Sequence, residues 1–373
     1  MRLIPIECVK EGCYLAKTIF DENGRILLRE GVRLTDNLVK RIRSINIFSL
    51  YITDEYSNGE IEDIIQPELR QKSIRVVRET FSSVERILTS LDTQNLSSRN
   101  KNLLIKQREE YFDDILNVAT ELIENILSNK QMLVNLVDIK SMDAYTYQHC
   151  VNVAVLSLVM GMSLNLPKND LKDLCVGALI HDIGKVFVPK EIIVKNSSLT
   201  DDEFALMKTH PSKGYEYLSN AINLSSNSKL VILQHHEKED GSGYPMALKG
   251  DKISLLAKIV AITDVYDALT SDRPYRKALS PCEALEFIMA GSGTHFDPDL
   301  VEAFTKVIVP FPTGTIVKLS NGEIAMVEET PPNYPLRPTI KILKSSIDND
   351  RVGVNINLLT ELSLVISSIQ YEI

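Results

Sequence analysis

The sequence lacks a hydrophobic run long enough to cross a membrane. The longest candidate, "CVNVAVLSLVMGMSLNL" at residues 150–166, is shorter than the roughly 18 to 20 apolar residues that a span needs, and Asn152, Ser157 and Asn165 interrupt it. We therefore interpret this stretch as a helix buried on all sides. The first residues, "MRLIPIECVKEG", contain no apolar core of the signal-peptide kind, so no secretion signal is expected.

An excess of basic residues is also missing. The 41 Lys and Arg residues are outnumbered by 50 Asp and Glu residues, which gives a net charge of −9. No stripe of cations is present to neutralise a phosphate backbone, so DNA and other nucleic acids are not expected as general partners. A small phosphorylated substrate needs only a few local cations and stays compatible with this balance.

Cysteine is sparse, with five residues that are scattered and odd in number. A disulfide framework is therefore not expected. We expect buried free thiols in a reducing, cytoplasmic setting instead. The residues concerned are Cys8, Cys13, Cys150, Cys175 and Cys282.

The chain of 373 residues is too long for one ordinary core, so two or three domains are expected. Residues 1–60 alternate in the manner of strands around an Asn23-Gly24 turn, which predicts a small β-rich N-terminal domain. As a separate expectation, we assign this domain a regulatory role. Residues 311–373 return to this period around Asn321-Gly322 and predict a β-rich C-terminal segment. Long internal repeats and low-complexity tracts are absent from the sequence.

Residues 61–130 have a helical pattern. Apolar residues with spacings of 3, 4, 3, 4 and 3 form a short heptad seam at Ile74, Val77, Phe81, Val84, Leu88 and Leu91. A second helix follows the polar segment "DTQNLSSRNK". Two interpretations fit this linker: a helical hairpin within one chain, or a homodimer paired through residues 67–92.

Residues 131–310 are predicted to be nearly all helical. Thr200 with Glu203 forms one capping box, and Ser280 with Glu283 forms another that has Pro281 at its first helical position. The fold class is therefore multidomain, with an all-α catalytic domain between two small β-rich flanks.

All six histidines fall in this helical middle. His181 and Asp182 are predicted to end an amphipathic helix, with Gly184 at its C′ position. A bound metal ion explains a histidine and an aspartate at the end of a buried helix, because imidazole and carboxylate are ligands for Fe, Mn, Zn or Ni. Lys185, one turn further on, would repel that metal unless the substrate is an anion.

Further candidate ligands share this setting, each at the end or on the buried face of a predicted helix. Together they make seven, enough for two ions that share one carboxylate. The seven are His149, His181, Asp182, His210, His235, His236 and Asp264.

These residues lie in segments that resemble the HD-GYP proteins, a branch of the HD phosphohydrolase superfamily. The resemblance covers about residues 143–304, with the segments in the family's order. They are "YTYQHCVNVA", "ALIHDIGKVFVPKEI", "MKTHPSKGYEYL", "VILQHHEKEDGSGYP", "KIVAITDVYDALTSDRPYRKALS" and "GTHFDPDLVEAF".

The resemblance implies that all seven residues bind two divalent ions per chain, iron or manganese first and zinc, nickel or magnesium as alternatives. It implies that Asp182 is the bridging, catalytic carboxylate and that Lys185 touches the scissile phosphate. Gly243, Tyr244 and Pro245 are the "GYP" itself. Arg273 and Arg276 match positions that hold the nucleotide.

The sequence departs from the family pattern at two positions. Lys238 replaces the usual arginine after "HHE", and Tyr145 stands where some members have a glutamate for a third metal. A phenol is a poor ligand for these ions, so a dinuclear centre is predicted. Asp267 is the candidate to supply the charge if a third ion binds.

The implied activity is hydrolysis of cyclic di-GMP to linear pGpG or GMP by attack of a hydroxide that bridges the two metals. Two alternatives stay open: a cyclic-dinucleotide receptor with little turnover, and a hydrolase that prefers a hybrid cyclic GMP-AMP dinucleotide. An eroded ligand set would favour the receptor, and this set is intact. A diguanylate cyclase or another signalling protein is a candidate partner for the GYP surface.

Overall fold

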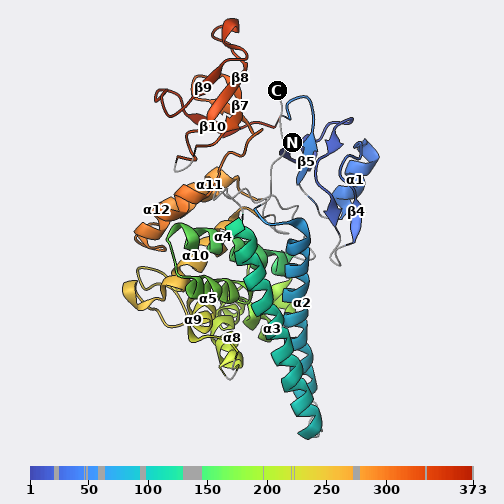
Figure 1. Cartoon of the computed structure of the whole chain (residues 1–373), viewed down its shortest axis with the longest axis vertical. Coiled ribbons are helices and arrows are strands. Elements are labelled where there is room, and N and C mark those ends of the chain that lie inside the picture. Colours follow the sequence, from blue (N-terminus) through green and yellow to red (C-terminus); the bar gives the residue numbers. More distant parts are fainter. Residues whose placement is uncertain are drawn as a thin grey trace.

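The computed structural model describes residues 1–20, 25–45, 47, 49–57, 64–92, 98–128, 145–195, 197–219, 221, 223–271, 278–331 and 334–371, without the side chains of residues 90–92, 98–108, 145 and 349. A helical body forms the middle of the chain, and small β-sheets lie at the two ends (Figure 1). Both the helical middle and the β-rich flanks of the predicted fold class are therefore present.

The N-terminal region is built on a three-stranded antiparallel sheet. Its strand order is β1 (Arg2–Pro5), β5 (Ser49–Thr53), β2 (Tyr14–Leu15). Helix α1 (Asp36–Ser44) begins where the Thr35 side chain accepts a hydrogen bond from the Leu38 amide. Strands β3 (Ile19–Phe20) and β4 (Ile26–Leu28) pair on either side of the predicted Asn23-Gly24 turn. The turn itself lies outside the described residues.

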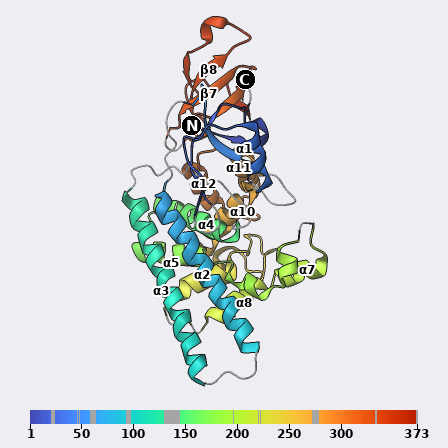
Figure 2. The same ribbon diagram turned by 90° about the vertical axis from the view of Figure 1, so that its right-hand side faces the viewer.

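The C-terminal region is a five-stranded antiparallel sheet with the order β10-β6-β7-β8-β9. The predicted hairpin at Asn321-Gly322 joins β6 (Ile316–Leu319) to β7 (Ile324–Glu329), with Val317 opposite Ala325. The remaining strands are β8 (Thr339–Lys344), β9 (Asn355–Asn357) and β10 (Ile366–Ile369). Arg2 Nη1 donates to the Tyr371 carbonyl at 3.2 Å, so the two β-regions contact each other where the two ends of the chain lie close together (Figure 2).

Helices α2 (Pro67–Asp92) and α3 (Ser98–Ser128) pack against each other and cover one side of the helical body (Figures 1 and 2). The apolar seam on α2 is covered within the chain: Val77 and Val84 are fully buried, and Ile74 and Phe81 nearly so, in the same core as α3 and α4. These four side chains are therefore covered within one chain, as in the helical-hairpin interpretation, and pairing of two subunits through residues 67–92 stays a prediction.

The body is completed by helices packed around α4 (Tyr145–Ser163). Val151, Val155 and Val159 of α4 are fully buried, as expected for a helix enclosed on all sides. Among the described residues no helix is both long and apolar enough to span a bilayer. The other α-helices are α5 (Lys168–Leu179), α6 (Lys190–Ile193), α7 (Asp201–Met207), α8 (His210–Leu218), α9 (Ser226–Gln234), α10 (Leu255–Leu269), α11 (Pro281–Ala290) and α12 (Pro298–Val307).

Local sequence fixes several helix starts. Both predicted capping boxes are formed, at Thr200 with Glu203 and at Ser280 with Glu283. Each satisfies two backbone groups that a helix N-terminus otherwise leaves unpaired. The five cysteines are free thiols, as predicted, and Cys150 and Cys175 are buried.

Candidate metal centre

All seven predicted ligands meet in the interior of the helical body, in two groups. Cluster A consists of His149, His181 and Asp264, and cluster B consists of Asp182, His210, His235 and His236. Within each cluster, one ligand atom from every residue lies within 4.8 Å of the others. The residues come from five segments of the chain, so tertiary packing and not local sequence brings them together.

Helix ends supply most of these ligands. His181 and Asp182 lie in the turn between α5, which ends at Leu179, and the 3₁₀ helix η2 (Ile183–Phe187). His210 is the first residue of α8, and His235 follows the last residue of α9. Residues at a helix end are free of the fixed 100° spacing, so neighbours such as His181 and Asp182 can face a common point.

Gly184 does not cap a helix at C′ as predicted. Instead, a Cβ atom at this position would lie 1.8 Å from the carbonyl oxygen of His210 and 2.8 Å from the amide nitrogen of Gly214. Glycine is therefore needed because the start of α8 packs directly on the turn that carries Asp182. This close approach holds His210 beside Asp182.

Asp182 connects the two clusters. Its Oδ2 atom lies 3.5 Å from Nε2 of His181 in cluster A, while its Oδ1 atom lies 3.4 Å from Nε2 of His210 in cluster B. The side chain is only 2% exposed. Burial alone would raise the pKa of this carboxyl, but Lys185 and the surrounding histidines hold the pKa well below its usual value. Asp182 is thus an anion with one oxygen facing each cluster.

Three of the histidines present their Nε2 atoms to the centre because their Nδ1 atoms are engaged elsewhere. The Nδ1–H group of His181 donates to the Ala178 carbonyl at 2.7 Å. In the same way, His210 donates to the Met207 carbonyl at 2.8 Å and His235 to the Ile232 carbonyl at 2.9 Å. A hydrogen bond at one ring nitrogen selects the tautomer whose other nitrogen carries a lone pair. Three lone pairs therefore point inward.

Two observations test whether a cation fits this arrangement. Nε2 of His181 is buried and has no hydrogen-bond partner among the described residues. Nε2 of His210 and Nε2 of His235 lie 3.3 Å apart, although both Nδ1 hydrogens are already donated to carbonyls. Lone pairs that face each other in a buried site repel unless a cation lies between them. The residues fit divalent metal ions.

Burial also keeps the three histidines of cluster B uncharged. It lowers the pKa of His210 to about 3 and that of His236 to about 4, and it holds the pKa of His235 well below its usual value. Neutral imidazole is the form that ligates metals, so these three residues need not lose a proton near pH 7.

His149 in cluster A differs, because it lies between two carboxylates. Nδ1–H donates to Oδ2 of Asp267 at 2.7 Å, and Nε2 lies 3.0 Å from Oδ1 of Asp264. Burial alone would lower the pKa of His149, yet these two carboxylates raise it to about 9. Asp267 lies outside both clusters and holds the His149 ring through this hydrogen bond.

Lys185 lies beside the shared carboxylate, with Nζ 2.5 Å from Oδ2 of Asp182. Its side chain is 29% exposed, so the cation stands at the boundary between the centre and solvent. This position agrees with the prediction that a cation accompanies the metal site.

The Gly-Tyr-Pro segment covers one side of cluster B. The Tyr244 ring lies over His236, with centroids 4.8 Å apart and an interplanar angle of 30°. A Cβ atom on Gly243 would lie 2.4 Å from the amide nitrogen of Lys238, so only glycine allows this loop to fold back on the end of α9. Arg273, Arg276 and the side chain of Tyr145 lie outside the described residues.

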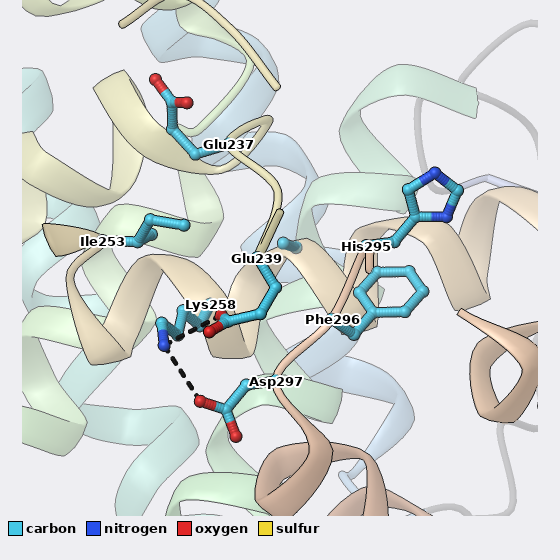
Figure 3. A pocket seen from close by; sticks show the side chains of 8 residues that line it. Glu237, Glu239, Ile253, Lys258, His295, Phe296 and Asp297 are labelled. Carbon is cyan, nitrogen blue, oxygen red and sulfur yellow. Dashed lines mark hydrogen bonds and ion pairs between the residues drawn. The ribbon is translucent and has the colours of Figure 1, made fainter. Parts of the chain in front are cut away.

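Sequence reasoning missed two groups that hold this loop. The Glu237 carboxylate is buried and accepts hydrogen bonds from the amides of Met246 at 2.7 Å and Leu248 at 2.9 Å. Lys258 pairs with Glu239 at 3.0 Å and with Asp297 at 2.9 Å, which ties the loop to the start of α12 beside a small cavity (Figure 3). The signal for Glu237 was its place directly after the paired histidines.

The sixth histidine, His295, lies outside both clusters and lines the small cavity beneath the loop (Figure 3). The metal centre therefore draws on five of the six histidines.

Residues 121–300 match the family model described as an HD domain, and residues 316–371 match one described as a KOW domain associated with an HD domain. The C-terminal sheet is therefore KOW-like, an identity that its strand pattern alone did not predict.

Curated proteins give a consistent picture. A cyclic di-GMP phosphodiesterase of Pseudomonas aeruginosa is 38% identical over 229 residues, which cover 61% of this chain and 55% of that protein. One of Thermotoga maritima is 31% identical over 277 residues, 69% of this chain and 71% of that protein. A 3'3'-cGAMP-specific phosphodiesterase of Vibrio cholerae is 33% identical over 225 residues, 60% of this chain and 40% of that protein.

The chain thus spans about half the length of the Pseudomonas relative and less than half of the Vibrio one. With the HD-domain match, the extensive likeness to the Thermotoga protein and the Gly-Tyr-Pro segment beside a histidine and aspartate centre, this chain belongs to the HD-GYP family of the HD phosphohydrolase superfamily.

Proposed function

We propose that this chain is a metal-dependent phosphodiesterase that hydrolyses cyclic di-GMP to linear pGpG or GMP. The observation that carries the proposal is the shared carboxylate of Asp182, with one oxygen directed to each of two ligand clusters. Relatives named as cyclic di-GMP phosphodiesterases support the choice of substrate. We also propose that the β-rich N-terminal region is regulatory.

Two divalent ions fit the donor set, one in each cluster, with Asp182 between them. Imidazole nitrogens with carboxylate oxygens favour iron or manganese, and zinc is compatible with the same donors. When bound, such a pair supplies Lewis acidity and lowers the pKa of the water that attacks phosphorus. Among the described residues no further group joins the two clusters, and Asp267 is engaged with His149, which supports two ions and not three.

The residues around the ions have separate roles in this proposal. Lys185 holds Asp182 in place and, from its partly exposed position, neutralises a non-bridging phosphate oxygen. Tyr244 lies over His236 and gives the substrate pocket an aromatic wall. Arg273 and Arg276 would bind phosphate or a guanine edge, because a guanidinium group donates two parallel hydrogen bonds.

A second substrate is favoured by a specific observation. Two relatives that are 33% and 31% identical are named as 3'3'-cGAMP-specific phosphodiesterases. The ligand clusters bind the phosphodiester and its nucleophile, and these are the same in both cyclic dinucleotides. The choice between them therefore depends on groups that contact the bases.

The test is a hydrolysis assay on the full chain, stripped of metal and then reloaded with Mn²⁺ or Fe²⁺. Initial rates are compared for cyclic di-GMP, 3'3'-cGAMP and a simple aryl phosphodiester, with products separated by chromatography. We expect metal-dependent turnover that is fastest with cyclic di-GMP. Faster turnover of 3'3'-cGAMP would show that the hybrid dinucleotide is the preferred substrate. Tight binding of cyclic di-GMP by the metal-loaded protein without turnover would show that the chain is a receptor and not an enzyme.

A further inference from the structure

A buried arginine from outside the ligand clusters approaches the metal centre. Arg70 lies in the first turn of α2, the helix that follows the N-terminal β-region, and only 3% of its surface is exposed. Burying a guanidinium group is costly unless its hydrogen bonds are satisfied. An arginine at this position therefore calls for an explanation in terms of what it contacts.

Arg70 contacts α4 through an asparagine. Nη1 of Arg70 donates to Oδ1 of Asn152 at 2.7 Å, and Nδ2 of the same asparagine donates to Oδ1 of Asp267 at 3.1 Å. Asn152 and Asp267 are 1% and 0% exposed. Because a cation lies at one end of the amide and an anion at the other, only one of its two orientations is favourable.

Asp267 carries the connection into cluster A. Its second carboxylate oxygen accepts the Nδ1 hydrogen of His149 at 2.7 Å, which directs Nε2 of that ring toward Asp264. Four buried groups from α2, α4 and α10 thus form one continuous series of hydrogen bonds. Such partners behind a metal ligand fix its tautomer and its orientation.

We propose that Arg70 is a positioning residue for the metal centre: it fixes the amide of Asn152, which fixes Asp267 and through it His149. The proposal rests on the metal centre described under the proposed function. Without the guanidinium group, the amide is free to turn and place its oxygen against the Asp267 carboxylate, which weakens the support of His149. The same series of hydrogen bonds connects α2, the helix that follows the N-terminal β-region, to His149 of cluster A.

The test compares Arg70→Met with Lys72→Met. Both changes replace a cation on the same turn of α2 and keep the aliphatic stem. Lys72 pairs with Glu121 of α3 at 2.6 Å, on a surface where both side chains are 42% exposed, so its loss leaves the buried series intact. Mn²⁺ alone is titrated into the metal-free proteins by calorimetry, and electron paramagnetic resonance distinguishes a coupled pair of ions from a single one.

We expect Arg70→Met to lower the binding affinity for one of the two Mn²⁺ ions by about tenfold and to leave the affinity for the other unchanged. A tenfold loss lies within the range seen when a group that supports a metal ligand is removed. At limiting Mn²⁺ the variant should show the signal of a single ion where the unmodified chain shows a coupled pair. Lys72→Met should bind both ions as the unmodified chain does. Equal weakening at both sites, or no change, would overturn the proposal.

A double mutant separates the series from simple packing. Once Asn152→Leu has removed the amide, adding Arg70→Met should cost no further affinity for either ion, whereas independent packing effects would add. If Arg70→Met does not fold, Arg70→Lys takes its place, because a lysine is too short to keep the 2.7 Å contact. Unchanged binding by that variant would equally overturn the series. Failure of the unmodified chain to bind two Mn²⁺ ions would instead overturn the proposed function.

Discussion

The two ligand clusters are chemically unequal, although a single carboxylate joins them. In cluster B, His210 and His235 are held by main-chain carbonyls, and burial keeps their pKa values low. In cluster A, His149 is held by the Asp267 carboxylate, and its pKa is raised to about 9. Cluster B is therefore ready for a cation near neutral pH, while cluster A must first release a proton.

This difference suggests an order of metal binding. An ion that enters cluster B meets neutral imidazoles and the anionic Asp182. An ion that enters cluster A must displace the Nε2 proton that His149 shares with Asp264.

The largest effect should come from removing what the clusters share. Asp182→Asn keeps the shape of the side chain but removes its charge, so we expect both ions to be lost and hydrolysis to fall by at least about 10³-fold. Metal content by mass spectrometry and initial rates measure this. Asp173→Asn on α5 is the control, because Asp173 is only partly buried and accepts a hydrogen bond from Asn227, which belongs to neither cluster. If the Asp182→Asn protein still binds two ions, the Asp182 carboxylate is not needed to join the two clusters.

Removing one ligand from each cluster should separate them. His149→Ala and His235→Ala are each expected to retain one ion and to lose activity by roughly 100-fold, because both ions act on the same phosphodiester. The ion retained by His149→Ala should bind as tightly as the first ion of the unmodified chain. Loss of both ions from His149→Ala would mean that the clusters do not fill independently.

The pH dependence sharpens the comparison. The pKa of His149 is raised from 6.5 to about 9 by Asp264 and Asp267, so below pH 9 a proton must leave before a metal binds. We expect affinity for the second Mn²⁺ to rise about tenfold per unit between pH 7 and 9. Affinity for the first should stay nearly constant, because His210 and His236 have pKa values of about 3 and 4. If the affinities for the two ions change equally with pH, the proposed difference between the clusters is wrong.

A smaller and more local effect is expected from Gly184→Ala. The added methyl group would meet the His210 carbonyl at 1.8 Å, so α8 must move away from Asp182. Overpacking of this kind costs about 1 to 3 kcal/mol of stability, and we expect weaker metal binding in cluster B alone. Gly161→Ala is the control, because its new Cβ would meet the ends of flexible leucine side chains at 2.9 Å. Thermal unfolding and Mn²⁺ titration of both variants measure the difference.

The sequence allowed the ligands to be predicted because each stands out locally. A histidine or aspartate on an otherwise apolar helix face, as at Asp264, is visible within a dozen residues. Helix starts such as Ser280 with Glu283, and the hairpin at Asn321-Gly322, are equally local. These are the features that hydrophobic periodicity and capping chemistry record.

The groups that support the ligands could not be found in this way. Arg70 is 82 residues from Asn152, which is 115 residues from Asp267, so no local pattern joins them. Gly184 looked like a helix cap because the approach of His210 cannot be seen in the sequence. The heptad seam on α2 left a helical hairpin and a homodimer both open, because spacing alone does not say which surface covers it. In the structure, α3 and α4 of the same chain cover its buried part.

The burial of α4 has a consequence for how the chain is made. This helix carries His149, and it packs against α10 and α12, which are synthesised after it. At the roughly 5 to 20 residues per second of translation, the part of α4 that packs against these two helices waits roughly 7 to 30 s for them. During that interval the nascent chain exposes part of a largely apolar helix, so we expect its yield in cells to depend on chaperones that bind emerging polypeptides.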